Sequence, residues 1–494
     1  MKKTIAIVGS GTAGLVSALI IKSLFCNYTV KIVSSSVVGI IGVGEGTTEH
    51  WEKFLKICNI SAEELIVETE ATHKYGILFK NWSTNLPNYY HSISSHSETR
   101  GSFIGNYSYC LANDWLLTNT FSTVPLSENK IVKTDFPHRN VNQYHFDTFK
   151  LNDFLLKTAK RRGIEHIDDY VVSINRNLQN GFIESLGLKD EKALLYADFF
   201  IDASGFQRVL MGNLDKQEFI DYNEYLPCDS AFNFPTPLED SGQIKPYTLA
   251  TAMSSGWVWE IPTQKRRGNG YVYSSAFCSE NEAIDEVSNL YGFQVEPVKS
   301  FKFNAGYYKN TWQYNCVSIG LSSGFVEPLE ATSISVSIQQ SLLLCSYLPT
   351  FKHGNVNSVK SYNSIVDGIM ENILLMISLH YVSDRIDSDM WRNQKNSKKP
   401  EELQRLIGLW SERCPELHDI LNTGYELFQI PHFWHVAQGQ GILHKNLAFE
   451  QMSDYSSWRD MEKQVNNIRS EILTKETIDH AQSLRDLVGA HENI

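Results

Sequence analysis

The 494-residue chain lacks clustered basic residues, paired cysteines and long apolar runs. Its net charge of -12 argues against sequence-independent nucleic-acid binding, which needs Lys and Arg gathered on one face. Its eight cysteines are scattered and never form C-x-x-C, so neither a zinc site nor a disulfide framework is indicated. No apolar run reaches the roughly 18 residues of a membrane helix. We therefore expect a soluble, cytoplasmic protein with no metal, nucleic-acid or membrane partner.

The composition instead favours a packed enzyme-sized protein. Apolar residues make up 42% and aromatic residues 12% of the chain, which is typical of a globular protein. The length allows two or three cores, or one large core with a satellite layer. The sequence leaves open whether the protein forms a homo-oligomer.

A glycine-rich turn follows the first apolar segment. Residues 4–8 are typical of a buried strand, the next six read G-x-G-x-x-G, and an apolar helical face follows. In this order the glycines permit a tight turn, close approach to a pyrophosphate and close helix packing, and the helix N-terminus attracts the anion. An ordinary glycine turn is the alternative. The predicted cofactor contacts are Gly9, Gly11, Thr12, Ala13 and Gly14.

Three later segments fit the same nucleotide-binding domain. Residues 29–33 predict a second strand, which ends at Ser34 where an acid usually binds the adenosine ribose. A hydroxyl binds the ribose more weakly than a carboxylate does. Residues 197–205 and 315–320 each read as a strand that ends in glycine, and Leu321 follows the second. These strand-and-glycine segments predict one nucleotide-binding domain that is discontinuous in sequence.

The most specific pattern is Gly-Trp-Val-Trp-Glu-Ile-Pro at residues 256–262. Residues i and i+2 of a strand share one face, so Trp257 and Trp259 should line the same surface. Without a wider pattern, both rings would read as core aromatics.

Two candidate catalytic residues lie in recognisable surroundings. Lys74 precedes Tyr-Gly-Ile-Leu-Phe-Lys-Asn-Trp, and Glu330 lies in Gly-Phe-Val-Glu-Pro-Leu-Glu-Ala-Thr-Ser-Ile at residues 324–334. Alone, a lysine reads as a solvated charge and a glutamate in a first helical turn as a dipole partner. Together with the glycine and tryptophan patterns, however, they make nearly the whole chain resemble the flavin-dependent tryptophan halogenases.

This resemblance implies an α/β fold: an FAD-binding dinucleotide fold of the flavin monooxygenase, glutathione-reductase-like type, with a second sheet and a C-terminal helical layer. We expect residues 1–335 to form the discontinuous FAD-binding and halogenation core and residues 336–494 a mainly helical, substrate-side domain. It also implies a flavin-contacting strap and a further contact at Leu321. The predicted strap is residues 42–47, and its predicted cofactor contacts are Gly42, Val43, Gly44 and Glu45.

The implied chemistry uses reduced FAD, O2 and a halide ion to make hypohalous acid. Lys74 would direct this acid, as an ammonium or through a haloamine, and Glu330 would polarise the ring N–H or accept the ring proton. Thr332 and Ser333 would hold the halide by backbone N–H groups. Ala331 and Ser333 replace the serine and glycine of the family's F-x-x-P-x-x-S-x-G motif, so we expect bromide or iodide to be preferred to chloride.

The resemblance places the aromatic substrate near His91, Trp257, Trp259, Pro328 and Trp434. The segment Phe-Trp-His-Val-Ala-Gln-Gly-Gln-Gly at residues 433–441 is typical of less specialised members, so we expect an indole or another electron-rich aromatic. A single nucleotide fingerprint implies a separate NAD(P)H-dependent flavin reductase. The alternatives are an aromatic hydroxylase of the flavin monooxygenase type and a non-enzymatic FAD-binding redox or interaction protein.

Overall fold

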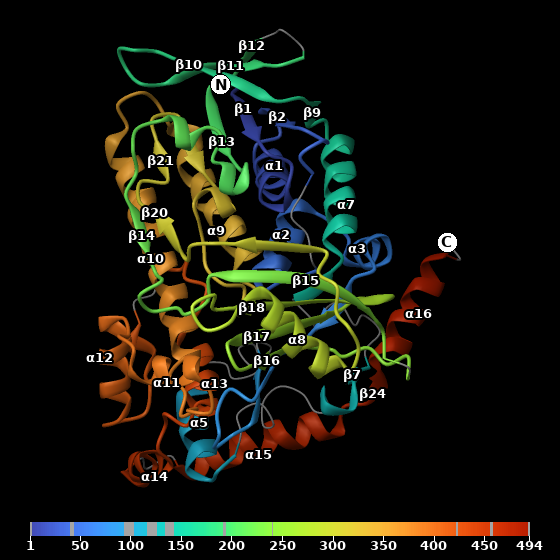
Figure 1. The fold of residues 1–494 in the computed structure, drawn as a ribbon, viewed down its shortest axis with the longest axis vertical. Helices are drawn as coiled ribbons and strands as arrows, with labels where there is room; N and C mark the ends of the chain where they lie inside the picture. The colour runs from blue at the N-terminus through green and yellow to red at the C-terminus, as the bar shows by residue number, and fades with distance from the viewer. Residues whose placement is uncertain are drawn as a thin grey trace.

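The computed structural model describes residues 2–39, 44–92, 103–115, 126–133, 143–190, 194–239, 241–420, 423–454 and 458–492. A six-stranded sheet in the upper part of Figure 1 has the order β21-β22-β13-β1-β2-β9. Its strands are β1 (Thr4–Val8), β2 (Thr29–Ser34), β9 (Glu165–Asp168), β13 (Phe199–Asp202), β21 (Trp312–Gln313) and β22 (Cys316–Ser318). All neighbours are parallel except β21 and β22. The predicted strands of the nucleotide-binding domain therefore lie in one sheet.

Three helices pack together beside this sheet. They are α1 (Thr12–Leu24), α7 (Thr148–Arg161) and α9 (Thr332–Tyr347), and α1 contacts both of the others. The side chain of Asp147 caps α7 by accepting the N–H groups of Phe149 and Lys150. Both α1 and α9 are buried along most of their length, so the apolar residues of α1 lie inside the molecule as predicted.

A second, seven-stranded sheet has the order β19-β15-β18-β17-β16-β5-β6. Its strands are β5 (Gly76–Lys80), β6 (Asn88–Ser92), β15 (Ser230–Pro237), β16 (Thr248–Ala252), β17 (Gly256–Pro262), β18 (Arg266–Tyr273) and β19 (Lys299–Lys302). Every residue of β17 is buried, and Trp259 faces Gly270 in the register of β18. A Cβ at Gly270 would lie 2.1 Å from the Trp259 ring, so this glycine leaves the space that the indole fills.

Smaller sheets complete the strand structure. The sheet β3-β8-β4 joins β3 (Glu45–Gly46), β8 (Gln143–Phe146) and β4 (Thr72–Lys74), and thereby brings Lys74 close to the expected strap. The other strands are β7 (Lys130–Val132), β10 (Val171–Arg176), β11 (Ile183–Leu188), β12 (Leu194–Tyr196), β14 (Phe219–Asp221), β20 (Gly306–Tyr308), β23 (Gly324–Phe325) and β24 (Thr477–Asp479).

The described chain after residue 335 is mainly helical, as expected. The remaining helices are α2 (His50–Cys58), α3 (Ala62–Thr69), α5 (Phe103–Ala112), α8 (Glu280–Tyr291), α10 (Val356–His380), α11 (Asp389–Asn396), α12 (Glu401–Trp410), α13 (Ile430–Gly439), α14 (Lys445–Asp454), α15 (Trp458–Thr474) and α16 (His480–Glu492). The expected boundary at 335/336 falls inside α9, and β24 pairs with β7. The boundary between residues 1–335 and 336–494 therefore does not coincide with the end of a helix or strand. The roles assigned to the two parts stay predictions.

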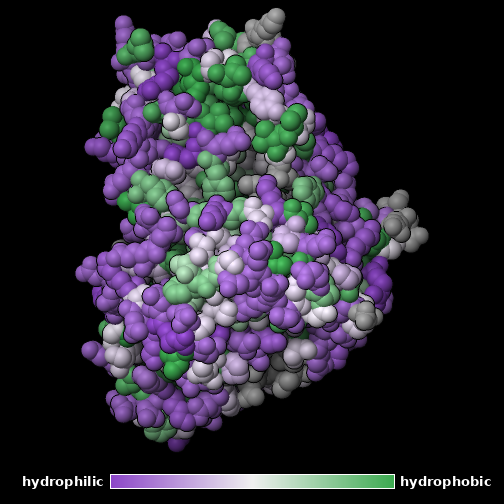
Figure 2. Space-filling model, in the orientation of Figure 1, coloured by the Kyte–Doolittle hydropathy of each residue, from purple (hydrophilic) through white to green (hydrophobic). Residues whose placement is uncertain are grey.

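The face shown in Figure 2 is mostly hydrophilic, and hydrophobic side chains gather on it toward the upper end.

A cleft of about 380 Å³ near β10 and β11 includes Phe182, Phe199, Leu348 and Phe351 in its lining. Among the helices that the structure describes, none combines the length and apolar character needed to cross a bilayer.

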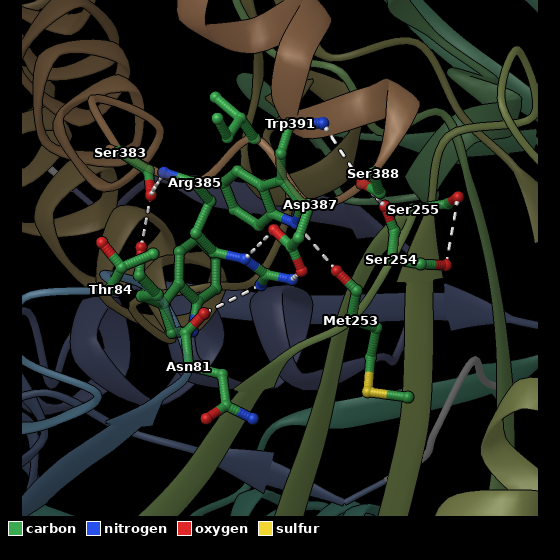
Figure 3. A network of polar contacts seen from close by, with 12 residues as sticks. Asn81, Thr84, Met253, Ser254, Ser255, Ser383, Arg385, Asp387, Ser388 and Trp391 are labelled. Carbon is green, nitrogen blue, oxygen red and sulfur yellow. Dashed lines mark hydrogen bonds and ion pairs between the residues drawn. The ribbon is translucent and has the colours of Figure 1, made fainter.

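A polar network fastens the segment after α10 to the second sheet (Figure 3). Arg385 donates two hydrogen bonds to the carboxylate of Asp387, at 2.9 and 2.7 Å, and one of 2.8 Å to the Asn81 carbonyl. Its guanidinium lies 4.6 Å from the ring centre of Trp391, whose Nε1 donates to the Met253 carbonyl at 2.8 Å. The network therefore fixes the C-terminal end of α10.

Replacing Arg385 with lysine should destabilise this attachment. A lysine keeps the charge but loses the planar fork and the ring stacking, so we expect a loss of roughly 2 kcal/mol in the free energy of unfolding. The exposed Arg392, which pairs with Asp389, provides the control, and Arg392→Lys should cost about 0.5 kcal/mol or less. Urea unfolding measures both variants. Equal unfolding midpoints would contradict the assignment.

Candidate active site

The N-terminus of α1 presents a cradle for a pyrophosphate. A Cβ at Gly9, where φ is +111°, would lie 2.2 Å from the Ala203 oxygen, and one at Gly14 would lie 2.1 Å from the Gly9 oxygen. At Gly11, by contrast, a Cβ would meet nothing within 4 Å. No side chain caps the helix at Gly11, and its first turn contains no acidic residue. This open helix N-terminus fits the pyrophosphate of FAD.

The turn at Gly320, which follows β22, lies against this cradle. Thr12 and Ala13 begin α1, and a Cβ at Gly320, where φ is +68°, would lie 2.7 Å from the Ala13 Cβ. Leu321 follows in a short 3-10 helix, η5 (Gly320–Ser322). The structure therefore brings the glycine turn and the segment of Leu321 together, as the predicted cofactor contacts require.

Ser34 ends β2, but its hydroxyl already has partners. It donates to Ser10 Oγ at 2.7 Å and lies 2.9 Å from His166 Nε2. Beside it in the sheet is Asp168, which accepts the Ser36 N–H at 2.8 Å. A carboxylate that β2 lacks is thus present at the end of the neighbouring strand β9. The sequence analysis missed it because the two strands are far apart in the chain.

The two glycine environments predict different defects. Gly14→Ala forces a Cβ onto a backbone oxygen, so we expect a loss of about 1–3 kcal/mol in the free energy of unfolding without any cofactor present. Gly11→Ala places its methyl group in open space, so the apoprotein should keep its stability while its affinity for FAD falls. Thermal unfolding and flavin titration measure the two effects. Weakened stability in both variants, with equal FAD affinity, would contradict the cradle.

The described part of the strap lies between the second sheet and β8. Gly44 has a φ of +91°, and its N–H donates to Thr148 Oγ1 at 3.0 Å, while Glu45 pairs with Phe146. Burial raises the pKa of the Glu45 carboxyl to about 7, and its Oε2 has no hydrogen-bond partner among the described residues. The other two predicted strap residues, Gly42 and Val43, lie outside the described residues.

Lys74 lies at the end of β4 and is 1% exposed. Its Nζ donates to the Thr47 carbonyl at 2.8 Å. Burial lowers the pKa of the ammonium to about 8, although the nearby charges of Glu330 and Glu49 oppose this shift. A Cβ at Gly46 would lie 3.5 Å from Lys74 Nζ and 3.6 Å from the Cβ of Ala331. Lys74 and Ala331, the residue that precedes α9, therefore both lie against Gly46.

Glu330 is buried and bound by two histidines. Nδ1 of His91 lies 2.9 and 3.0 Å from its two carboxylate oxygens, and Nε2 of His380 lies 2.7 Å from Oε1. Burial alone would raise the pKa of this carboxyl, but the charges of and hydrogen bonds from these histidines outweigh it and lower the pKa to about 2. Glu330 is therefore an anion at neutral pH.

His380 is not among the residues that the sequence analysis singled out, because its contact with Glu330 has no local signal in the sequence. Its Nδ1 lies 3.1 Å from the Tyr89 hydroxyl, to which the Gln440 amide donates at 3.1 Å. The same amide donates to the His380 carbonyl at 3.0 Å. The Gly-Gln-Gly element thus helps to hold the histidine, and the Arg385 network attaches the segment that follows it.

The expected halide contacts begin α9. Thr332 is its first residue and is buried, whereas Ser333 is exposed. Ala331 precedes them with a φ of 56°, and its N–H donates to the Pro328 carbonyl at 3.0 Å. No side chain caps this helix. Its free backbone donors fit a small anion.

The tryptophan pair shares one face of β17, as predicted, with ring centres 6.1 Å apart. Trp257 Nε1 donates to Glu327 Oε2 at 2.7 Å, and the Tyr381 hydroxyl donates to the same oxygen at 2.7 Å. Burial raises the pKa of the Glu327 carboxyl to about 7. This second buried glutamate was not singled out from the sequence.

Trp434 is a fully buried residue of α13. Its Nε1 donates to the Pro415 carbonyl at 3.2 Å, and its ring packs edge-on against Tyr107. Two histidines of the same helix, His432 and His435, have their ring centres 5.1 and 5.7 Å from that of His91. The predicted substrate contact of Trp434 therefore stays untested. Within the described ranges, no cluster of His, Cys, Asp and Glu could hold a metal ion.

Comparison with known proteins agrees with this geometry. Residues 4–453 match the family model "Tryptophan halogenase". The chain is 30% identical over 454 residues to tryptophan 6-halogenase SttH from Streptomyces toxytricini, covering 84% of this chain and 85% of SttH. The chain therefore belongs to the tryptophan halogenase family, whose members are flavin-dependent oxidoreductases.

Two solved structures share the fold. A tryptophan halogenase from Shewanella frigidimarina NCIMB 400 is 26% identical with a TM-score of 0.92, covering 99% of this chain and 98% of that one. Tar14, a tryptophan C-6 flavin-dependent halogenase (chlorinase) from taromycin biosynthesis, is 26% identical with a TM-score of 0.85, covering 98% and 99%. The predicted fold class, an FAD-binding α/β fold with a second sheet and a helical layer, is confirmed.

Proposed function

We propose that the protein uses FADH2, O2 and a halide ion to halogenate an indole or another electron-rich aromatic. The observation that carries this proposal is the meeting of Lys74 and Glu330 around the start of α9, both 1% exposed and close enough for the Glu330 charge to act on the lysine. Reduced flavin and O2 would oxidise the halide to hypohalous acid. A separate NAD(P)H-dependent reductase would supply the reduced flavin.

Lys74 would orient the hypohalous acid as an ammonium. With a pKa of about 8, the charged form predominates at pH 7. A buried ammonium donates strong hydrogen bonds and aims the electrophilic halogen at one ring carbon. Glu330, a buried anion whose charge acts on Lys74, would accept the proton that the ring carbon loses, which restores aromaticity.

The substrate need not be free tryptophan. Support comes from α13, where Trp434 is held in the core by the Pro415 carbonyl instead of being presented as an aromatic lid. The helix belongs to residues 336–494, which we propose as the substrate side of the molecule. A broader pocket would accept indoles and phenols.

Bromide or iodide would be preferred to chloride. Both are easier to oxidise, and Ser333 adds a side chain beside the backbone donors of α9 where the family motif has glycine. The proposed donors are the N–H groups of Thr332 and Ser333. Tar14 is a chlorinase, and the proposed preference of this chain differs from it.

Mass spectrometry of indole, tryptophan and a phenol, incubated with enzyme, FAD, NADH, a flavin reductase and competing halides, tests the proposal. We expect brominated or iodinated indole to exceed chlorinated product and halogenated tryptophan. Lys74→Ala should lower the yield by roughly 100-fold, since positioning of the electrophile is lost. Ser333→Gly should shift the product toward chlorination.

Three results would contradict parts of the proposal. Oxygenated product without halide indicates the flavin-dependent hydroxylase instead. A yield indifferent to Lys74 indicates free hypohalous acid in solution. Turnover of tryptophan far above indole and phenol, or chloride equal to bromide, contradicts the substrate or halide assignment alone.

The pH dependence of halogenation distinguishes the proposed ammonium role of Lys74 from the alternative, a haloamine. A basic group loses its proton as the pH rises through its pKa, so the ammonium is lost above a pH of about 8. We expect halogenated product per FADH2 consumed to fall above that pH. A rise over the same range would instead support a haloamine formed on the neutral amine.

A further inference from the structure

A line of polar side chains leads from Glu330 toward the surface, with hydrogen-bond distances as far as His432 and an ion-pair distance from there to Glu49. His91 uses both ring nitrogens, since Nδ1 lies 2.9 Å from Glu330 Oε1 and Nε2 lies 3.0 Å from His432 Nδ1. Nε2 of His432 in turn lies 3.8 Å from Glu49 Oε1. The side chains of Glu330 and His91 are 0% exposed and that of His432 is 3% exposed, whereas that of Glu49 is 29% exposed.

Each aromatic substitution releases one proton inside this closed site. A carboxyl whose pKa is held far below neutrality does not keep the proton, and Lys74 is already charged at neutral pH. An imidazole can accept a proton on one nitrogen while it loses a proton from the other. His91 and His432 are both placed for such a transfer, because the two nitrogens of each ring lie near different partners.

We propose that His91, His432 and Glu49 form a proton exit for Glu330, an inference that rests on the proposed halogenation. The ring C–H bond breaks, its electron pair returns to the ring, and Glu330 takes the proton. Protonated Glu330 passes this proton to Nδ1 of His91 in the ring tautomer that carries its proton on Nε2, and that Nε2 proton moves to Nδ1 of His432. The Nε2 proton of His432 then moves to Glu49, which releases it to water. No redox change occurs in these steps.

The other charged groups around the line favour this direction. His380 also contacts Glu330, but it leads to the Tyr89 hydroxyl, whose pKa burial and the nearby Glu330 charge hold well above its usual range despite the hydrogen bond from Gln440. Glu49 instead reaches solvent, with His50 Nδ1 3.9 Å from its Oε1. The positive charge of Lys74, near both glutamates, favours proton departure.

The test uses full-length enzyme with FAD, flavin reductase and bromide, with indole as substrate. His432→Asn keeps a polar side chain but cannot pass a proton through a ring, and Glu49→Gln removes the exposed acceptor. For each we expect kcat to fall roughly tenfold with KM unchanged, and the rate ratio in H2O and D2O to rise. The double variant should be no slower than the slower single variant, since both act on one pathway.

Two controls separate transfer from packing. His435→Asn, on the same helix and beside the His91 ring, leaves the line from Glu330 to Glu49 in place and should keep the wild-type isotope ratio. Rising buffer concentration should restore the rate of Glu49→Gln, because a dissolved base can replace an exposed acceptor. Thermal unfolding and flavin titration confirm that each variant is folded and loaded.

The outcomes are distinct. Wild-type enzyme that makes no halogenated indole refutes the proposed function itself. Wild-type activity combined with unchanged rates in His432→Asn and Glu49→Gln overturns the proton exit alone. Slower variants with an unchanged isotope ratio and no response to buffer also overturn it, because they show a merely structural role.

Discussion

The buried carboxylate of Glu330 is the constraint around which the centre of the molecule is arranged. An isolated charge taken out of water costs several kcal/mol unless partners compensate for it. Those partners come from distant segments: His91 from β6 and His380 from the end of α10. The second sheet and the long helix must therefore both reach the start of α9, and each histidine is held in place by further hydrogen bonds.

The same point joins the two main layers of the fold. The helix α9 packs against α1 of the parallel sheet, while its first residues lie near Lys74 and Glu330. A single rigid element therefore fixes the distance between the flavin cradle and the proposed halogenation site. Because α9 also spans the expected domain boundary, the two parts cannot move apart without breaking a buried helix.

Much of this arrangement was predictable from local sequence patterns. The strand Thr4–Val8 and the helix that follows were predictable because strand, glycine turn and helix are adjacent in sequence. The shared face of the tryptophan pair followed from strand periodicity. Lys74 and Glu330 were singled out through family-like surroundings, and the structure brings them together, although their roles stay predictions.

Residues joined only by tertiary structure could not be predicted. His380 and His432 have no spacing in the chain that marks them as partners of Glu330 or His91. Asp168 supplies an acid beside Ser34 only because β9 pairs with β2. The register of long-range pairs depends on the packing of the whole molecule, and a single sequence contains no direct record of it.

The hydrogen bond from Lys74 to the Thr47 carbonyl also links the lysine to the strap, whose described part begins at Gly44. Any ligand that displaces this backbone changes the surroundings of the ammonium and thus its proton affinity. Thermodynamic reciprocity requires the converse: the protonation state of Lys74 changes the affinity for that ligand by the same factor. If the flavin contacts the strap as predicted, cofactor loading and lysine ionisation form one coupled equilibrium, in which flavin binding takes up or releases protons.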